Sequence, residues 1–189
     1  MKVINNTTSY FDPAKNGSSK QFYRQLLMHL RELDAYNRDI VIVCIGSDRA
    51  TGDCLGPLVG DKLNKCSGPF YIYGTLEQPV HAKNLNSTLT HINNTYQDPL
   101  IIAIDASLGS SRHVGYVTII KGALRPGVGV DKDLPIVGDI SITGIVNVSG
   151  MLNQLLIQNT RLSLVMRLAD FISCGLKKAT SLSFPQVRA

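Results

Sequence analysis

The stretch IVIVCIGSDRATGDCLGPLVGDKL, residues 40–63, joins a strand pattern, a polar loop and a helix pattern. The run Ile40–Ile45 is apolar without alternation, which predicts a strand that is covered on both faces. Apolar residues at helical spacing predict a helix over Leu55–Cys66, with Pro57 in its first turn, where proline is tolerated. Asp53 stands just before this helix, at the mouth of the predicted strand.

The stretch PLIIAIDASLGSSRHVG, residues 99–115, repeats this arrangement. Here a strand predicted over Leu100–Ile104 ends at Asp105. In an open parallel sheet, the carboxyl ends of neighbouring strands line one crevice, and ligands bind in that crevice. We therefore expect Asp53 and Asp105 to face each other there, as a catalytic pair or as part of a metal site.

The rest of the chain continues the alternation and predicts the fold class. Further strands are expected over 70–73, 114–121 and 139–148, and further helices over 20–35, 79–93 and 153–178. This order is typical of an α/β protein, a three-layer αβα sandwich with a central twisted, mixed, mostly parallel sheet. Residues 1–18 are polar and predict a flexible N-terminal arm, and residues 19–189 are expected to form a single domain.

The composition is that of a compact globular protein, with 44% hydrophobic and 17% charged residues. No apolar run approaches the roughly 18 residues that cross a bilayer, and the N-terminus lacks the apolar core of a secretory signal. We expect a cytoplasmic protein without a membrane partner. The net charge of +5 is dispersed, so nucleic acid is not an expected partner. The four cysteines lack zinc-binding spacing and are interpreted as reduced packing residues.

The two aspartates are compatible with two kinds of chemistry. Two close carboxylates cannot both ionise cheaply, so they share a proton, and one then acts as a base while the other acts as an acid. Alternatively, both bind a divalent metal ion that activates water, with His81 as a further ligand. A simpler alternative gives them structural roles, with Asp53 capping the helix that follows and Asp105 beginning a turn.

Several other residues are candidates for supporting or substrate-binding roles. Backbone N–H groups of the loop from Gly46 to Gly52 are positioned to bind an oxyanion, and Asp48 lies in the same loop. His81 follows a predicted strand end and is expected to reach the crevice. Glu77 is a third acidic candidate at the same rim.

Four segments together resemble one family closely. They are GSDRATGDCLGPLVGDKL, YGTLEQPVHAKNL, IIAIDASLG and LIQNTRLSLVMRLADFI. They resemble sporulation proteins of the YyaC type (DUF1256-like), found in endospore-forming bacteria, over residues 39–176. That family is similar to the spore germination protease, an aspartic-type endopeptidase that degrades small acid-soluble spore proteins, and more distantly to hydrogenase maturation endopeptidases. The resemblance implies a phosphorylase/hydrolase-like α/β fold with a sheet between helices.

The resemblance also implies roles for the two aspartates. The germination protease has one catalytic aspartate in a D-x-LGP context, which matches Asp53 in GDCLGP, and another at a strand end, which matches Asp105 in IIAIDASLG. In the hydrogenase maturation enzymes, the equivalent acidic positions help to bind nickel together with a histidine from a later loop. The corresponding segment here, LRPGVGVDKDLP, has no histidine.

The expected function is therefore that of a sporulation-associated aspartic-type endopeptidase that needs no cofactor. Its expected partner is a protein substrate, with small acid-soluble spore proteins as the candidates, in the cytoplasm of the sporulating cell. Two alternatives stay open, a non-catalytic module that binds a protein or peptide on the same fold, and a metal-dependent maturation endopeptidase. The apolar stripes on the helices at both ends of the chain are also compatible with a homodimer.

Overall fold

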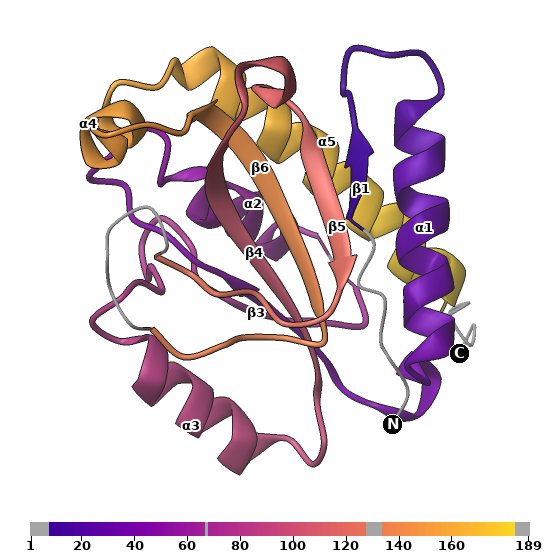
Figure 1. Ribbon diagram of the computed structural model, residues 1–189. Coiled ribbons are helices and arrows are strands. Elements are labelled where there is room, and N and C mark those ends of the chain that lie inside the picture. Colours follow the sequence, from indigo (N-terminus) through magenta and orange to yellow (C-terminus); the bar gives the residue numbers. More distant parts are fainter. Residues whose placement is uncertain (1–7, 67, 128–133, 184–189) are drawn as a thin grey trace, which may run out of the picture.

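A computed structural model describes residues 8–66, 68–127 and 134–183, which fold into a six-stranded sheet with helices on both faces (Figure 1). Two short 3₁₀ turns, Ala35–Asn37 and Ser111–His113, interrupt the connections. The strands and helices in chain order are β1 Ser9–Phe11, α1 Ser18–Glu32, β2 Ile40–Cys44, α2 Leu55–Asn64, β3 Tyr71–Tyr73, α3 Leu85–Thr95, β4 Leu100–Gly109, β5 Val117–Lys121, β6 Ile140–Val148, α4 Asn153–Gln158 and α5 Leu162–Ser183.

The sheet is mixed and mostly parallel, as predicted. Its strand order is β1-β5-β6-β4-β2-β3. The four strands β6, β4, β2 and β3 run parallel to one another, whereas β5 is antiparallel to β6, and β1 is antiparallel to β5. The αβα fold class expected from the sequence is confirmed.

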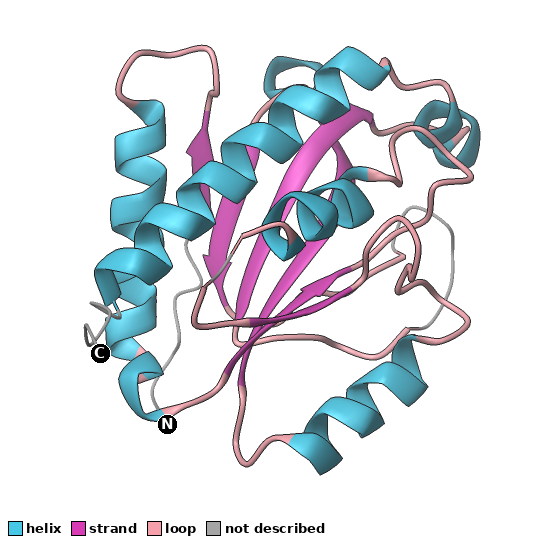
Figure 2. Ribbon diagram, turned by 180° about the vertical axis from the view of Figure 1, so that it is seen from behind, coloured by secondary structure: helices cyan, strands magenta, loops and turns pink. Residues whose placement is uncertain are grey.

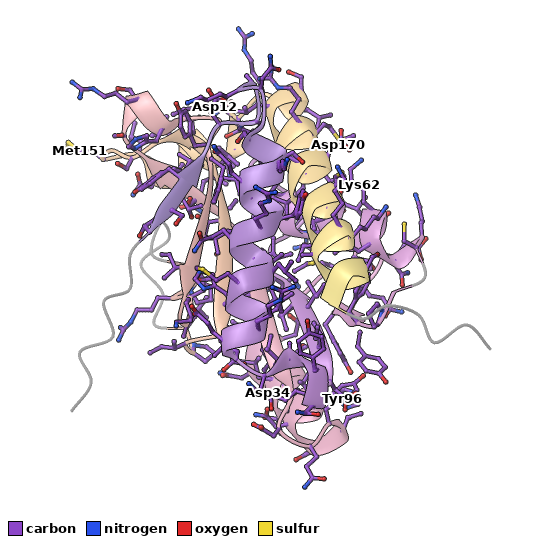
Figure 3. All side chains as sticks on the ribbon, turned by 90° about the vertical axis from the view of Figure 1, so that its right-hand side faces the viewer. Asp12, Asp34, Lys62, Tyr96, Met151 and Asp170 are labelled. Carbon is purple, nitrogen blue, oxygen red and sulfur yellow. The ribbon has the colours of Figure 1, made fainter. Side chains whose placement is uncertain are left out.

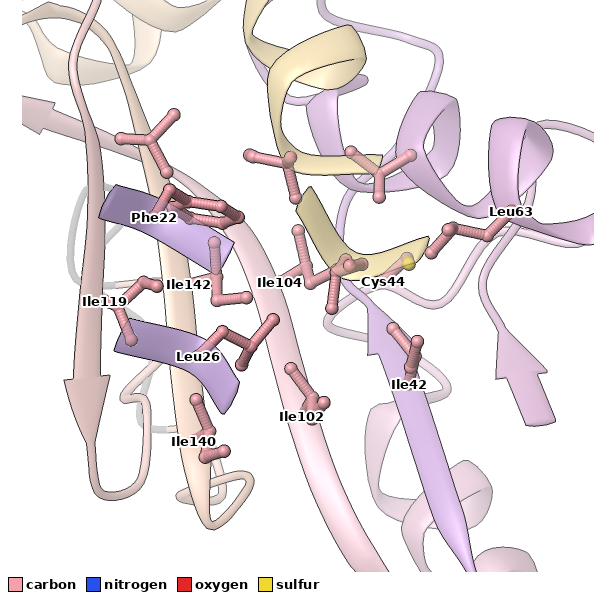
Figure 4. Close-up of a cluster of buried hydrophobic side chains, with 14 of the residues drawn as sticks. Phe22, Leu26, Ile42, Cys44, Leu63, Ile102, Ile104, Ile119, Ile140 and Ile142 are labelled. Atoms are coloured by element: carbon pink, nitrogen blue, oxygen red, sulfur yellow. The ribbon is translucent and has the colours of Figure 1, made fainter. Parts of the chain in front are cut away.

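Two hydrophobic clusters hold the layers together, one on each face of the sheet. Successive side chains of a strand point to opposite faces, so β4 contributes Ile102 and Ile104 to one cluster and Ala103 to the other. The larger cluster packs the sheet against α1, α2 and α5 (Figures 2 and 4), with Phe22 and Leu26 of α1 fully buried in it. The smaller cluster packs α3 and the loop before β6 against the opposite face.

The chain connections create a crevice between β2 and β4. From β2 the chain passes through α2 to β3 on one side of β2, and then through α3 to β4 on the other side. The two connecting helices lie on opposite faces of the sheet, since α2 packs in the larger cluster and α3 in the smaller one. The strand order therefore reverses between β2 and β4, and in open α/β sheets ligands bind at such a point.

The N-terminal segment differs from its prediction as a flexible arm over residues 1–18. Ser9–Phe11 forms β1, which pairs with β5 at the edge of the sheet. Phe11 is buried and meets the ring of Phe22 edge-on, with ring centroids 5.3 Å apart. This apolar contact fixes a short strand whose polar neighbours gave no strand pattern, so the prediction is wrong for these residues. Residues 1–7 of the predicted arm lie outside the described residues.

The first turn of α2 lies against the end of β2 with no room for a side chain between them. A Cβ atom added to Gly56 would collide with the backbone carbonyl oxygen of Ile45 and would lie 2.8 Å from its backbone nitrogen. Both obstacles are backbone atoms, which cannot rotate away. Gly56 is therefore required for α2 to pack at this distance, although glycine is a poor helix former.

We expect Gly56→Ala to destabilise the fold by about 3 kcal/mol or more, because the added methyl group forces α2 away from β2. In an unconstrained helix the same change would stabilise by about 1 kcal/mol, so the sign of the effect is diagnostic. Chemical denaturation measures the free energy of unfolding. Gly150→Ala is the control, since its added Cβ would meet one atom at 3.9 Å. A stabilised Gly56→Ala protein would show that the packing is looser than described.

Candidate active site

Asp105 lies inside β4, at the point where its neighbour β2 ends. The last residue of β2, Cys44, pairs with Ile104, and the Ile45 N–H donates to the Ile104 carbonyl oxygen over 2.7 Å. We predicted that the strand stops at Asp105, but β4 continues to Gly109 because β6 still pairs with it on the other side. Asp105 therefore projects from a continuous strand beside the space that β2 leaves open.

Asp53 is held over the same space by the turn between β2 and α2. Gly46 follows β2 with a φ of 142°, and a Cβ atom there would collide with the backbone carbonyl oxygen of Asp53. The Ser47 N–H donates to this oxygen over 3.3 Å. The N-cap residue of α2 is Cys54, and the described residues show no side-chain hydrogen bond that caps this helix, so the alternative in which Asp53 serves as a helix cap is wrong.

The two aspartates line one cleft, which has two adjoining compartments of about 370 and 350 Å³. Asp53, Asp105, Gly127 and Ile157 belong to the walls of both. The first compartment is also lined by Ile45, Gly46, Ala50, His81, Ala82, Pro126, Leu134, Gln154 and Gln158. The second is also lined by Ala106, Ser107, Leu108, Leu124, Arg125, Thr143, Ser149 and Asn153. The cleft lies at the reversal of strand order, as expected.

Burial raises the pKa of both carboxyl groups, but not equally. Asp105 is 8% exposed, and burial raises its pKa well above the ordinary value. The negative charge of Asp53 raises it further, against one stabilising hydrogen bond from the Ala106 N–H to Oδ1 at 2.8 Å. Burial also raises the pKa of Asp53, but the Ser47 backbone and His81 oppose this shift. These directions favour protonation of Asp105 over protonation of Asp53.

His81 reaches the cleft through a bridge between the end of β2 and the segment before α3. Ile45 pairs with Val80, whose carbonyl oxygen accepts the Gly46 N–H over 2.8 Å. The His81 N–H donates to Asn84 Oδ1 over 2.8 Å, which fixes the turn before α3. We predicted a helix beginning at Pro79–His81, but α3 begins at Leu85 because this turn comes first. The buried Nδ1 of His81 has no partner among the described residues.

Other predicted supporting residues do not have the expected roles. The N–H groups of Gly46 and Gly52 already donate to the carbonyl oxygens of Val80 and Ile157, over 2.8 and 2.9 Å. These two N–H groups, at the ends of the loop, are therefore not free to bind an oxyanion, contrary to the expectation for them. Asp48 and Glu77 are exposed and do not line the cleft.

The metal alternative requires Asp53, Asp105 and His81 to form a common set of ligands. Within residues 8–66, 68–127 and 134–183, no group of three or more His, Cys, Asp and Glu side chains is arranged to hold a metal ion. The residues present therefore do not fit a metal centre built on these three side chains.

Sequence reasoning missed the contribution of α4 to the cleft. Asn153, Gln154 and Ile157 line it, although they follow Asp105 by about fifty residues. The Gly52 N–H donates to the Ile157 carbonyl oxygen, and Asn147 Nδ2 donates to that of Leu156 over 2.8 Å, so α4 is tied to both the α2 loop and β6. The helical pattern predicted over 153–178 covers α4 but carries no sign that its residues reach the cleft.

Comparisons with known proteins cover most of the chain. A family model described as "Protein of unknown function (DUF1256)" matches residues 10–175. The "Uncharacterized protein YyaC" of Bacillus subtilis (strain 168) is 45% identical over 180 residues, which cover 95% of this chain and 87% of that protein. A crystal structure of the [NiFe] hydrogenase maturation protease HycI from Thermococcus kodakarensis KOD1 is similar with a TM-score of 0.44 and 19% identity, over 76% of this chain and 97% of that one. None of the described helices is long and apolar enough to cross a membrane.

The raised pKa of Asp105 predicts how stability depends on pH. The unfolded chain releases this proton near pH 3.9, whereas the folded protein holds it to higher pH. The contribution of this carboxyl to stability is thus fully present below about pH 3.9 and is lost as pH rises through the raised pKa. We expect Asp105→Asn to unfold with a free energy that falls less from about pH 4 to about pH 8 than that of the wild type, because each pKa unit corresponds to about 1.4 kcal/mol.

Chemical denaturation across this pH range checks the prediction. Asp48→Asn is the matched control, since it removes an exposed carboxyl from the neighbouring loop and should leave the slope unchanged. Equal slopes for Asp105→Asn and the wild type would mean that Asp105 titrates as an ordinary carboxyl.

Proposed function

The chain belongs to the DUF1256 family, and from the geometry of its cleft we propose that it is an aspartic-type endopeptidase that hydrolyses peptide bonds with Asp53 and Asp105. One observation carries the proposal: two carboxyl groups line one cleft, and their surroundings favour a proton on Asp105 and a charge on Asp53. A pair of titratable groups whose environments separate their pKa values is typical of acid–base catalysis.

The roles of the two carboxyls follow from their protonation. Asp53 accepts a proton from a water molecule as the water oxygen attacks the peptide carbonyl carbon, and Asp105 donates its proton to the carbonyl oxygen. The tetrahedral intermediate then breaks. Asp53 passes its proton to the leaving nitrogen, and a hydroxyl of the intermediate returns a proton to Asp105 as the new carboxyl group forms. Water is consumed, and the pair regains its starting state.

The family resemblance supports the same residues. The contexts of Asp53 in GDCLGP and Asp105 in IIAIDASLG are those of the catalytic aspartates in the similar spore germination protease. We extend the proposal to small acid-soluble spore proteins as substrates, in the cytoplasm of the sporulating cell. The loop between β5 and β6 borders the cleft through Leu124–Gly127 and Leu134, where a bound peptide would contact it.

The alternative of a non-catalytic binding module would be supported if either carboxyl had a purely structural role. Asp53 does not cap α2, and Asp105 lies within a strand rather than beginning a turn. The Asp105 carboxyl accepts one hydrogen bond, from the next residue along its own strand. The Ser47 backbone also stabilises the charged form of Asp53. These local contacts do not explain why both carboxyls line one cleft, and this favours catalysis.

Purified protein mixed with small acid-soluble spore proteins should produce a discrete cut that intact-mass spectrometry detects. We expect Asp53→Asn and Asp105→Asn each to lower the cleavage rate by about 10²–10⁴-fold, because each removes one proton transfer. Asp98→Asn is the control: it removes an exposed carboxyl that precedes the same strand, at a positive φ that asparagine tolerates. Cleavage that persists in both active-site variants would overturn the mechanism, and loss of the cut on adding chelator would replace it with a metal-dependent one.

The pH profile of cleavage should be bell-shaped, because the pair works only while it holds a single proton. The rate falls at low pH as Asp53 gains a proton, and it falls at high pH as Asp105 loses one. An ordinary aspartate has a pKa near 3.9. Because the pKa values of Asp53 and Asp105 are both raised, both limbs of the profile should lie at higher pH than this. Steady-state kcat/KM across pH measures this, and a profile that rises toward the lowest pH would contradict the assigned protonation.

A further inference from the structure

An exposed apolar cluster lies beside the cleft, at the start of α4. Met151, Leu152 and Leu155 have relative exposures of 103%, 63% and 50%. Met151 projects from the periphery of the molecule in Figure 3. None of the residues of α4 is buried, so this helix contributes its apolar side chains to the surface rather than to the core. Contiguous apolar groups on a protein surface are typical of a contact site for another molecule.

The backbone that carries this cluster is fixed. The Ser149 N–H donates to the Gly109 carbonyl oxygen and the Gly150 N–H to Asn153 Oδ1, both over 2.8 Å. The Leu156 N–H donates to the Leu152 carbonyl oxygen over 3.0 Å, and α4 is tied to the α2 loop through Gly52. The apolar side chains are therefore displayed on an anchored segment, which lowers the entropy that is lost when a partner binds.

The position of α4 beside the cleft indicates which kind of molecule contacts the exposed apolar cluster. The same helix lines the cleft with Asn153, Gln154 and Ile157. It is six residues long, or about 9 Å at about 1.5 Å per residue, a length that about three residues of an extended chain span. A polypeptide that lies in the cleft and continues past α4 thus reaches Met151 and Leu155 within a few residues of the aspartate pair.

The segment that carries the apolar cluster has no charged residues of its own. Residues 140–160 contain no Asp, Glu, Lys or Arg, so this stretch presents only apolar and uncharged polar groups. We propose that Met151, Leu152 and Leu155 form a docking surface for apolar side chains of the protein substrate, on the segment a few residues from the scissile bond. This docking surface rests on the proposed function, since the substrate is the polypeptide that occupies the cleft.

Binding to a non-cleaving variant tests the docking surface independently of catalysis. In the Asp53→Asn background, fluorescence anisotropy measures the affinity for a labelled small acid-soluble spore protein. We expect Met151→Ser/Leu155→Ser to weaken binding about tenfold or more, because truncated apolar anchors account for much of the affinity of an interface. Met28→Ser is the matched control, since Met28 is 44% exposed on α1, which does not line the cleft.

Cleavage by the otherwise wild-type enzyme separates docking from chemistry. The double variant should cut a peptide of about six residues around the scissile bond at an unchanged rate, and it should cut the whole protein with KM raised about tenfold. Unchanged affinity and KM, or no binding of the labelled protein at all, would overturn the docking surface. Weakened binding without any cleavage would overturn the proposed function alone. A dimer that the double variant converts to monomer in sedimentation would assign the cluster to self-association and overturn the proposal.

Discussion

The close approach of α2 to the end of β2 is the constraint on which the site depends. Gly56 lets the first turn of the helix rest on the backbone of Ile45, and Gly46 lets the chain pass the carbonyl group of Asp53. A side chain at either position would move the turn that carries Asp53. Beyond Ile104, β4 has no neighbour on the side of β2, which opens the space that Asp105 enters. A backbone contact thus sets the relative position of two carboxyls from distant parts of the chain.

The site places a strained electrostatic arrangement on a rigid support. Burial disfavours the charged form of both aspartates, and the negative charge of Asp53 further disfavours a charge on Asp105. Two apolar clusters hold the surrounding strands and helices together, and the stability that they contribute offsets this local cost in free energy. A site whose residues reduce stability while the remainder of the fold supplies it is typical of functional positions.

Much of this arrangement could be predicted from the sequence, because its signals are local. The unbroken apolar runs of β2 and of the first half of β4 identify buried strands, and strand ends in a parallel sheet indicated that Asp53 and Asp105 would line one cleft. The remaining features depend on partners distant in the sequence. β1 exists because Phe11 packs on Phe22, and α4 joins the cleft because Gly52 donates to Ile157. The hydrogen bonds of the Gly46 and Gly52 N–H groups could not be predicted either, because the sequence indicates a loop but not its hydrogen-bond partners.

The two edge strands of the sheet have a consequence for how copies of this chain associate. β1 and β3 are each three residues long, and they leave few unpaired backbone groups along the borders of the sheet. Joining of sheets between molecules needs a long row of such groups, so short borders protect against fibrous aggregation. Any pairing of copies would then use side-chain surfaces of the helices instead of a shared sheet.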